Sequence, residues 1–131
     1  MSIEKEILNS CSTVAIVGVS SNETRPSHAV ARYLQDQGYE VIPVNPKESR
    51  ILGRNCYSDL KAIPGKVDVV DIFRRSEDVP PIVDQAIEIG AGAVWMQEGI
   101  RNEQAAEKAR KAGLKVVQDR CMLKEHRILN G

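Results

Sequence analysis

A short apolar run, residues 14–17, ends at Gly18 and leads through a polar loop into a helix that begins at Pro26. A β-branched and aliphatic run of this kind is typical of a parallel strand that is buried on both faces. The loop after such a strand lies at the carboxyl edge of its sheet, where ligands bind in open α/β folds. This stretch therefore predicts a buried strand followed directly by a helix.

The loop between this strand and helix has the chemistry of a phosphate site. Gly18 allows a sharp turn and a close approach by a ligand, and the helix offers unpaired N–H groups and the positive end of its dipole. Pro26 suits a first helical turn, where its missing N–H costs nothing. Arg25 adds a positive charge. The predicted contact residues are Gly18, Val19, Ser20, Ser21, Asn22, Thr24, Arg25 and Ser27.

Two alternatives stay open for this loop from the residues alone. A glycine after a buried strand also occurs as an ordinary structural turn. The G-x-G-x-x-G fingerprint of dinucleotide sites is incomplete here, because Ser20 and Glu23 stand where its second and third glycines would be.

The strand-helix alternation continues along the chain. Strands are expected at 13–18, 39–46, 67–73, 93–96 and 114–117, and a short further strand at 50–57. Helices are expected at 3–9, at 26–37, at 76–89 with Ser76 as its cap, and between Asn102 as cap and Gly113 as stop, with a helical turn within 58–65. Residues 118–131 are expected to form an exit loop and a basic tail. The pattern predicts an α/β fold with a doubly wound parallel sheet in a single domain, 1–131.

Bulk composition narrows the class of protein. The 18 basic and 18 acidic residues balance, so no overall field favours nucleic acid or an anionic membrane surface. No apolar run is long enough to span a bilayer, and the N-terminus lacks a signal-peptide pattern, so a cytoplasmic protein is expected. Cys11, Cys56 and Cys121 are widely spaced and are expected to be reduced thiols.

The carboxyl ends of parallel strands meet at one edge, so their exit loops should converge. That edge is cationic, because Arg25, Lys47 and Arg74 come from three different loops. Asn45 and Lys47 follow the second strand, where a nicotinamide-binding domain needs an acid for its ribose hydroxyls. This favours a ligand with several phosphates over a bare diol.

No catalytic or metal-binding constellation stands out. His28 and His126 are isolated in sequence, and structural roles are favoured for both. Cys121 is interpreted as a buried filler, with a reactive thiol activated by Arg120 as the alternative. No HExxH motif or carboxylate cluster is present, so no metal ligands are predicted.

Several motifs in order resemble the small stand-alone CoA-binding proteins, whose single Rossmann-like domain is similar to the CoA-binding domain of the succinyl-CoA synthetase α subunit. The matching segments are 14–20, 25–28, 41–46, 69–74, 95–100 and 119–121. The resemblance implies that the loop from Gly18 to Arg25 holds the phosphates of coenzyme A and that Lys47 meets a phosphate at its adenosine end. It further implies that Phe73 and Arg74 form a wall of the nucleotide site, and that Met96, Gln97 and Glu98 lie along the pantetheine arm. Asn45 and Pro46, at the end of the second strand, are also predicted to contact the cofactor.

The chain also departs from that family pattern. Ser20, Ser21 and Asn22 replace extra glycines of the synthetase loop, and the sequence stops where the domain with the phosphorylated histidine would begin. Ligase activity is therefore not implied, and a non-catalytic CoA or acyl-CoA binding module is favoured. The alternatives are an NAD(P)-dependent or flavin oxidoreductase, a CoA-supplying subunit of a split acyl-CoA synthetase, and a small CoA-handling enzyme that uses Cys121 or His28. A protein partner or a homo-oligomer remains open.

Overall fold

A five-stranded, wholly parallel sheet forms the centre of the computed structural model, which describes residues 2–130. Its strands lie in the order β2-β1-β5-β6-β7, and neighbouring strands pair in parallel. They are β1 (Thr13–Val17), β2 (Glu40–Val44), β5 (Val69–Ile72), β6 (Ala93–Met96) and β7 (Lys115–Val117). After β1 the chain adds β2 on one side, and it then crosses over to add β5, β6 and β7 on the other side. The boundary between β1 and β5 is therefore the topological switch point, where ligands bind in such folds.

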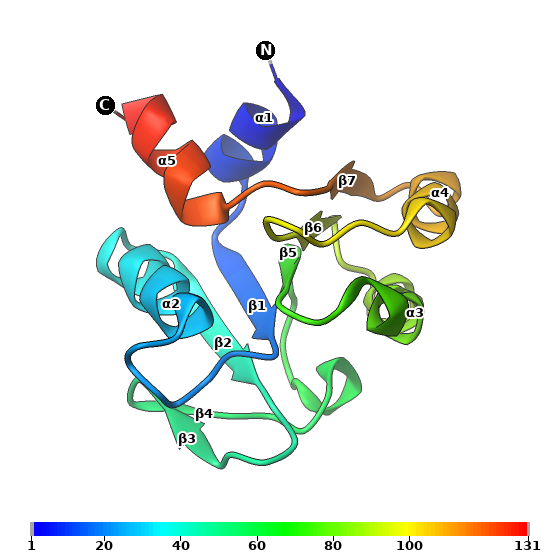
Figure 1. The fold of residues 1–131 in the computed structure, drawn as a ribbon. Helices are drawn as coiled ribbons and strands as arrows, with labels where there is room; N and C mark the ends of the chain where they lie inside the picture. The colour runs from blue at the N-terminus through cyan, green and yellow to red at the C-terminus, as the bar shows by residue number, and fades with distance from the viewer. Residues whose placement is uncertain (1, 131) are drawn as a thin grey trace.

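Helices cover both faces of the sheet (Figure 1), which confirms the predicted α/β, doubly wound, single-domain fold. One face is covered by α1 (Ile3–Ser10), α2 (Pro26–Asp36) and α5 (Met122–Asn130). The other is covered by α3 (Val79–Glu88) and α4 (Glu103–Lys111), with the short 3-10 turns η1 (Leu60–Ala62) and η2 (Ser76–Asp78) beside them.

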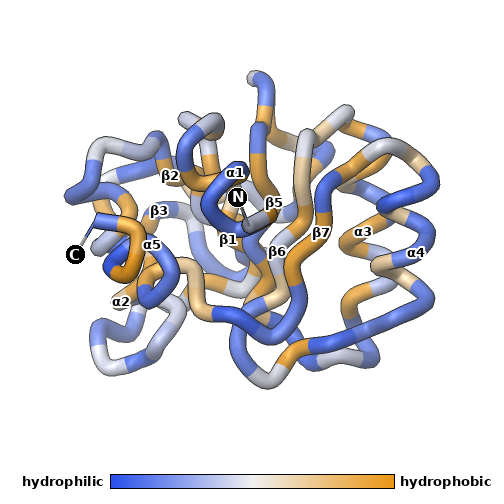
Figure 2. The backbone as a smooth tube through the Cα atoms, turned by 90° about the horizontal axis from the view of Figure 1, so that it is seen from above, coloured by the Kyte–Doolittle hydropathy of each residue, from blue (hydrophilic) through white to orange (hydrophobic). Residues whose placement is uncertain are grey.

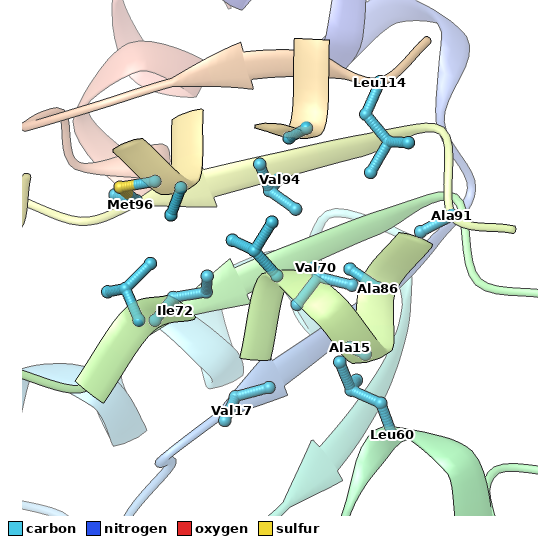
Figure 3. Close-up of a cluster of buried hydrophobic side chains, with 14 of the residues drawn as sticks. Ala15, Val17, Leu60, Val70, Ile72, Ala86, Ala91, Val94, Met96 and Leu114 are labelled. Carbon is cyan, nitrogen blue, oxygen red and sulfur yellow. The ribbon is translucent and has the colours of Figure 1, made fainter. Parts of the chain in front are cut away.

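The alternation of side chains along each strand divides the core into two layers. On β1, Ala15 and Val17 join the layer under α3 and α4, whereas Val14 and Ile16 join the layer under α1, α2 and α5. Figure 2 shows apolar residues along the strands and polar residues in many of the outer loops. Figure 3 shows the first layer, in which aliphatic side chains of neighbouring strands meet those of α3 and the η1 turn.

The prediction of one short strand over residues 50–57 is wrong. The segment makes a two-stranded antiparallel hairpin of β3 (Arg50–Ile51) and β4 (Arg54–Asn55), which is separate from the main sheet. Leu52 and Gly53 form its turn, both with positive φ. A tight turn of this kind reverses the chain after two residues, so an extended strand cannot continue through it.

The start of the third predicted helix also differs. Residues 76–78 form a 3-10 turn rather than the first α-helical turn. The Ser76 hydroxyl does not cap the helix but accepts a hydrogen bond from the Arg101 N–H at 3.0 Å. A long-range contact has therefore replaced the local cap.

The C-terminal segment was predicted as a basic tail, and this is wrong, because most of it folds into α5. Met122 is fully buried, and His126 is buried between Tyr33 and Tyr39, with its ring edge-on to both rings. Met122, His126 and Leu129 recur at i, i+4 and i+7, which is the spacing of one helical face. The high proportion of charged residues had masked this signal.

A hydrogen bond between Tyr33 Oη and His126 Nδ1, 2.7 Å long, holds α5 against α2. We expect Tyr33→Phe to lower the free energy of unfolding by about 1–2 kcal/mol, because it leaves a buried imidazole nitrogen with a weaker partner. Urea denaturation at pH 7.5 measures the change. Tyr57→Phe is the matched control, because no hydrogen bond of the Tyr57 hydroxyl occurs among residues 2–130, and an equal loss in both variants would contradict the prediction.

Candidate binding site at the carboxyl edge

The polypeptide turns off β1 at Gly18, whose φ is +88°. The Gly18 N–H donates to the Val44 carbonyl at 2.9 Å, so the loop starts against the end of β2. A Cβ at this position would overlap the Phe73 carbonyl oxygen and lie 3.2 Å from Arg74 Nε. Only glycine fits, and its small size lets the loop lie directly against the exit of β5.

Polar side chains hold the rest of this loop in place of the missing glycines. Ser27 Oγ accepts from the Ser20 N–H at 2.9 Å, and Ser20 Oγ accepts from the Asn22 N–H at 3.0 Å. Asn22 Oδ1 accepts from both the N–H and the hydroxyl of Thr24. These local bonds shape the loop without additional positive φ angles. Ser20, Asn22, Thr24 and Ser27 therefore have structural roles in addition to any contact with a ligand.

The loop ends at the N-terminus of α2. Arg25 is the N-cap residue there, and within the described chain no side chain caps this helix end. A pocket of about 220 Å³ lies beside it, lined by Gly18, Ser20, Arg25, Pro26, Ser27 and Phe73. Pro26 has no N–H, and the N–H groups of His28 and Ala29 donate to the Arg25 carbonyl, so among the described residues the Ser27 N–H is the one left without an acceptor in this first turn. This N–H, the positive dipole end and an arginine at one pocket form a good environment for an anion.

Asn45 connects the end of β2 to this loop. Its Nδ2 donates to the Val19 carbonyl at 2.9 Å, and its Oδ1 accepts from the Lys47 N–H at 2.9 Å. Lys47 itself is exposed. Ser21 Oγ donates to Glu48 Oε1 at 2.9 Å, which joins the two loops at their outer ends. The amide of Asn45 is thus committed to the protein, and Lys47 is left exposed to solvent.

Pro46 belongs to a second pocket, of about 180 Å³, that lies on the α3 side of the same edge. The sequence interpretation missed most of its lining. The residues are Val17, Val44, Pro46, Ser58, Asp59, Leu60, Arg74, Ile82 and Gln85. Gln85 Oε1 accepts from the Leu60 N–H at 3.1 Å and so joins the η1 turn to α3. The predominantly apolar walls suit a flat base better than a phosphate.

A third, open groove of about 540 Å³ runs between the exits of β5 and β6. It is lined by Phe73, Arg74, Arg75, Ser76, Glu77, Gly99 and Ile100. Phe73 also lines the pocket at the α2 N-terminus, and Arg74 also lines the pocket behind Pro46. The groove therefore shares one wall residue with each of the two pockets.

Met96, Gln97 and Glu98 lie in three different environments. The Met96 side chain is fully buried in the layer under α3 and α4 (Figure 3), and Gln97 is buried on the opposite face. Glu98 is exposed and pairs with Lys124 at 3.0 Å. The side chains of Met96 and Gln97 therefore face the interior, and Phe73, Gly99 and Ile100 line the groove instead.

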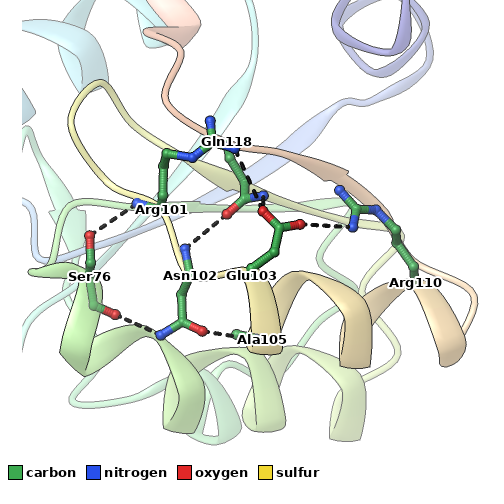
Figure 4. Close-up of polar contacts among 7 residues, drawn as sticks. All are labelled: Ser76, Arg101, Asn102, Glu103, Ala105, Arg110 and Gln118. Carbon is green, nitrogen blue, oxygen red and sulfur yellow. Dashed lines mark hydrogen bonds and ion pairs between the residues drawn. The ribbon is translucent and has the colours of Figure 1, made fainter.

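A polar network fixes the far side of the groove (Figure 4). Asn102 donates from its side chain to the Ser76 carbonyl at 3.0 Å and accepts from the Ala105 N–H, which confirms it as the α4 cap. The Asn102 N–H donates to Gln118 Oε1, and Gln118 Nε2 donates to Glu103. Loops after β5, β6 and β7 are thus joined.

The loop after β7 packs against the exit of β6. Asp119 has a positive φ of 56°, and its Oδ1 accepts from the Gly99 N–H at 2.7 Å. The Arg120 carbonyl accepts from Trp95 Nε1, while the Arg120 side chain is exposed. Arg75 and Arg120 are cations of this edge that were not among the predicted site residues. The sequence feature that could have indicated such a residue is an adjacent pair of charges directly after a strand, as at Arg74 and Arg75.

His28 and the cysteines have mainly structural surroundings. His28 is buried, and its Nδ1 lies 2.9 Å from the Ser20 carbonyl, to which it donates. Burial raises the pKa of the Cys11 thiol to about 11 and also raises the pKa of Cys56. Cys121 is partly buried against the α2–α5 layer.

Asp71 is the one fully buried carboxyl group of the described residues. Its Oδ1 accepts from Gln97 Nε2 at 2.6 Å, but Oδ2 has no hydrogen-bond partner. Burial raises the pKa of this carboxyl to about 7, because a charge there is poorly solvated; the hydrogen bond from Gln97 and the neighbouring backbone N–H of Ile72 oppose the shift. Asp71 is therefore substantially protonated at neutral pH.

The raised pKa of Asp71 makes the folded protein less stable as the pH rises. Between the unfolded-state pKa near 3.8 and about pH 7 the native state binds more protons, so the free energy of unfolding falls with pH, by up to about 1.4 kcal/mol per unit. We expect Asp71→Asn to remove this slope, measured by urea denaturation at pH 5 and pH 8. Asp68→Asn is the control: its pKa is lowered by backbone N–H groups, so it should leave the slope in this interval unchanged.

The fold defines a class: α/β domains with a parallel sheet, in which ligands bind at the topological switch point. Residues 12–127 match the family model described as CoA binding domain. The chain belongs to this CoA-binding family.

Relatives agree with this placement. An uncharacterized protein of Bacillus subtilis, YneT, is 40% identical over 124 residues, covering 95% of this chain and 92% of that protein. A structure from Pyrococcus horikoshii has 41% identity and a TM-score of 0.96 over 100% of this chain and 94% of that one. The α subunit of a Pyrococcus furiosus ADP-forming acetate–CoA ligase is 28% identical over 83% of this chain, which spans only 26% of that subunit. No helix within residues 2–130 is long and apolar enough to cross a membrane.

Proposed function

We propose that this protein binds coenzyme A or an acyl-CoA along the carboxyl edge of its sheet, as a cytoplasmic binding module without catalytic activity of its own. The observation that carries the proposal is the set of three hollows at this edge, in which the groove shares Phe73 with the pocket at the α2 N-terminus and Arg74 with the pocket behind Pro46. Together they offer an apolar pocket, a cationic pocket and an open groove. These environments suit a base, a pyrophosphate and an extended arm.

The proposed orientation follows from the chemistry of each hollow. The pyrophosphate lies at the α2 N-terminus, where Gly18 allows close approach and Arg25 supplies charge. The adenine enters the pocket behind Pro46, and Lys47 is close enough in the chain to meet the 3′-phosphate. The pantetheine arm follows the groove past Phe73 and Ile100. Ser21, Asn22 and Thr24 form the outer wall of the phosphate loop.

A CoA-supplying subunit of a split synthetase is the second candidate. The observation that favours it is that the chain spans 26% of the P. furiosus ligase α subunit and therefore corresponds to one part of that larger subunit. A nicotinamide-dependent oxidoreductase is less well supported. Asn45 stands where a ribose-binding acid is expected, and both ends of its amide are bonded to the protein.

The direct experiment has two parts. The purified protein is denatured and its released small molecules are identified by mass spectrometry, and the refolded or ligand-free protein is titrated by calorimetry with CoA, acetyl-CoA, dephospho-CoA, NAD and NADP. We expect CoA or an acyl-CoA to be released, and CoA to bind more tightly than either nicotinamide cofactor. Binding of NAD without binding of CoA would refute the proposal. Co-purification with a second chain would favour the subunit alternative.

A further inference from the structure

Asp71 lies directly beneath the proposed phosphate site, yet no part of that site uses it. In the β1–β5 register Asp71 pairs with Ile16, and Gly18 follows two residues later, so about 7 Å of strand separate the two levels. Asp71 is fully buried, and one of its oxygens has no partner. β5 ends one residue later, at Ile72, and Phe73 and Arg74 follow it.

Among residues 2–130, no cation neutralises this carboxyl group. Its hydrogen-bond partner is the neutral amide of Gln97, and the strand residues beside it are Ile16 and Trp95. Titratable and charged groups lie on every segment that covers this face. They are Glu4, Lys5, Glu6 and Cys11 of α1 and its cap; Arg25, His28, Arg32, Tyr33 and Asp36 of α2 and its cap; Tyr39 and Cys56 beside them; and Asp119, Arg120, Cys121, Lys124, Glu125, His126 and Arg127 of α5 and the loop before it. None of them forms a hydrogen bond or ion pair with Asp71 among the described residues. An ionised Asp71 would therefore be an uncompensated buried negative charge.

We propose that Asp71 couples binding at the carboxyl edge to proton uptake: the neutral carboxyl is the form that accepts an anionic ligand, and its ionisation weakens binding. This inference rests on the proposed function. A charge buried next to the site is little screened by salt, so it repels ligand phosphates more strongly than a surface carboxylate does. For an effective dielectric constant of about 20 and a separation of about 10 Å, the repulsion changes affinity roughly tenfold for each unit of ligand charge.

The pH range follows from the raised pKa of about 7 for this carboxyl. Below that value most molecules have neutral Asp71 and bind without repulsion. Above it, binding must return a proton to Asp71, so the ligand and the proton support each other. Affinity is therefore expected to fall as the pH rises through the neutral range.

The test is calorimetric titration of the wild-type protein and Asp71→Asn with CoA between pH 6 and pH 8.5. We expect the affinity of the wild type to fall about tenfold more than that of Asp71→Asn over this range. Ionisation of the ligand's own 3′-phosphate is common to both proteins and cancels in the comparison. His28→Gln is the second variant, because His28 is the other group here with an unpartnered buried atom, Nε2.

A measurement on the wild type alone covers the case in which Asp71→Asn does not fold. Dephospho-CoA lacks the phosphate monoester that titrates near neutrality, so its binding in two buffers of different ionisation enthalpy reports proton uptake by the protein. Uptake near pH 7.5 is expected. Binding without uptake, or a pH profile that Asp71→Asn leaves intact and His28→Gln removes, would overturn this inference alone. Absence of CoA binding at every pH would overturn the proposed function as well.

Discussion

Gly18→Ala is expected to destabilise the protein by about 2–5 kcal/mol and to abolish ligand binding at the carboxyl edge. The loss has two sources: an L residue at a φ of +88° costs about 1–2 kcal/mol, and forcing a methyl group into a packed contact costs about 1–3 kcal/mol. The contact is the Phe73 carbonyl, which belongs to the backbone and cannot rotate away. Urea denaturation measures the first effect and calorimetry with CoA the second.

Variants at two other glycines distinguish the backbone cost of Gly18→Ala from its steric cost. Gly38 and Gly113 have similar φ angles, +96° and +93°, but an added Cβ would meet nothing within 4 Å at either. We expect Gly38→Ala and Gly113→Ala to cost only the backbone part, about 1–2 kcal/mol. If Gly18→Ala were no more destabilising than these two, the close approach of the loop to β5 would not exist in solution.

Arg25→Ala and Lys47→Ala are each expected to weaken CoA binding by about 1.5–3 kcal/mol, as for the loss of a charge-assisted hydrogen bond. Both side chains are exposed, so neither substitution should lower the free energy of unfolding appreciably. Calorimetric titration gives the affinities. Lys111→Ala is the matched control, because Lys111 lies at the C-terminal end of α4, away from the carboxyl edge.

Dephospho-CoA shows which phosphate each cation meets. The effect of Lys47→Ala should largely disappear with this ligand if Lys47 meets the 3′-phosphate, whereas the effect of Arg25→Ala should persist because the pyrophosphate is still present. Unchanged CoA affinity in both variants would refute the assignment of phosphates to this edge. Equal effects of Lys47→Ala on both ligands would place Lys47 at the pyrophosphate instead.

The local pattern of apolar and polar residues was sufficient to predict a strand or helix wherever that pattern has one clear period. Examples are the aliphatic runs at β1, β5 and β6, the cap at Asn102 and the stop at Gly113. All five strands of the sheet were expected within a few residues of their bounds. The failures have local causes as well. Charged residues hid the apolar face of α5, and a two-residue turn at Leu52 and Gly53 divided the segment expected to be one strand.

The parallel order of the strands let the sequence also predict which loops meet. Gly18, Arg25, Lys47, Phe73 and Arg74 all follow strands, and the carboxyl ends of parallel strands share an edge whatever the helices between them contain. The lining of the individual hollows did not follow from this rule. Ile82 and Gln85 come from within α3, and their position depends on how that helix packs beside the η1 turn.

By itself, then, the sequence determined the alternation of strands and helices, the parallel sheet and the cationic character of its edge, because these depend on short-range periodicity and chain direction. Only the tertiary structure decided that Asn45 is bonded to Val19 and Lys47, that Met96 faces the interior, and that Asp71 lies buried with an unpartnered oxygen beneath the site. The physical reason is that a side chain's solvation and hydrogen bonding depend on groups from other segments, and local pattern does not specify their approach.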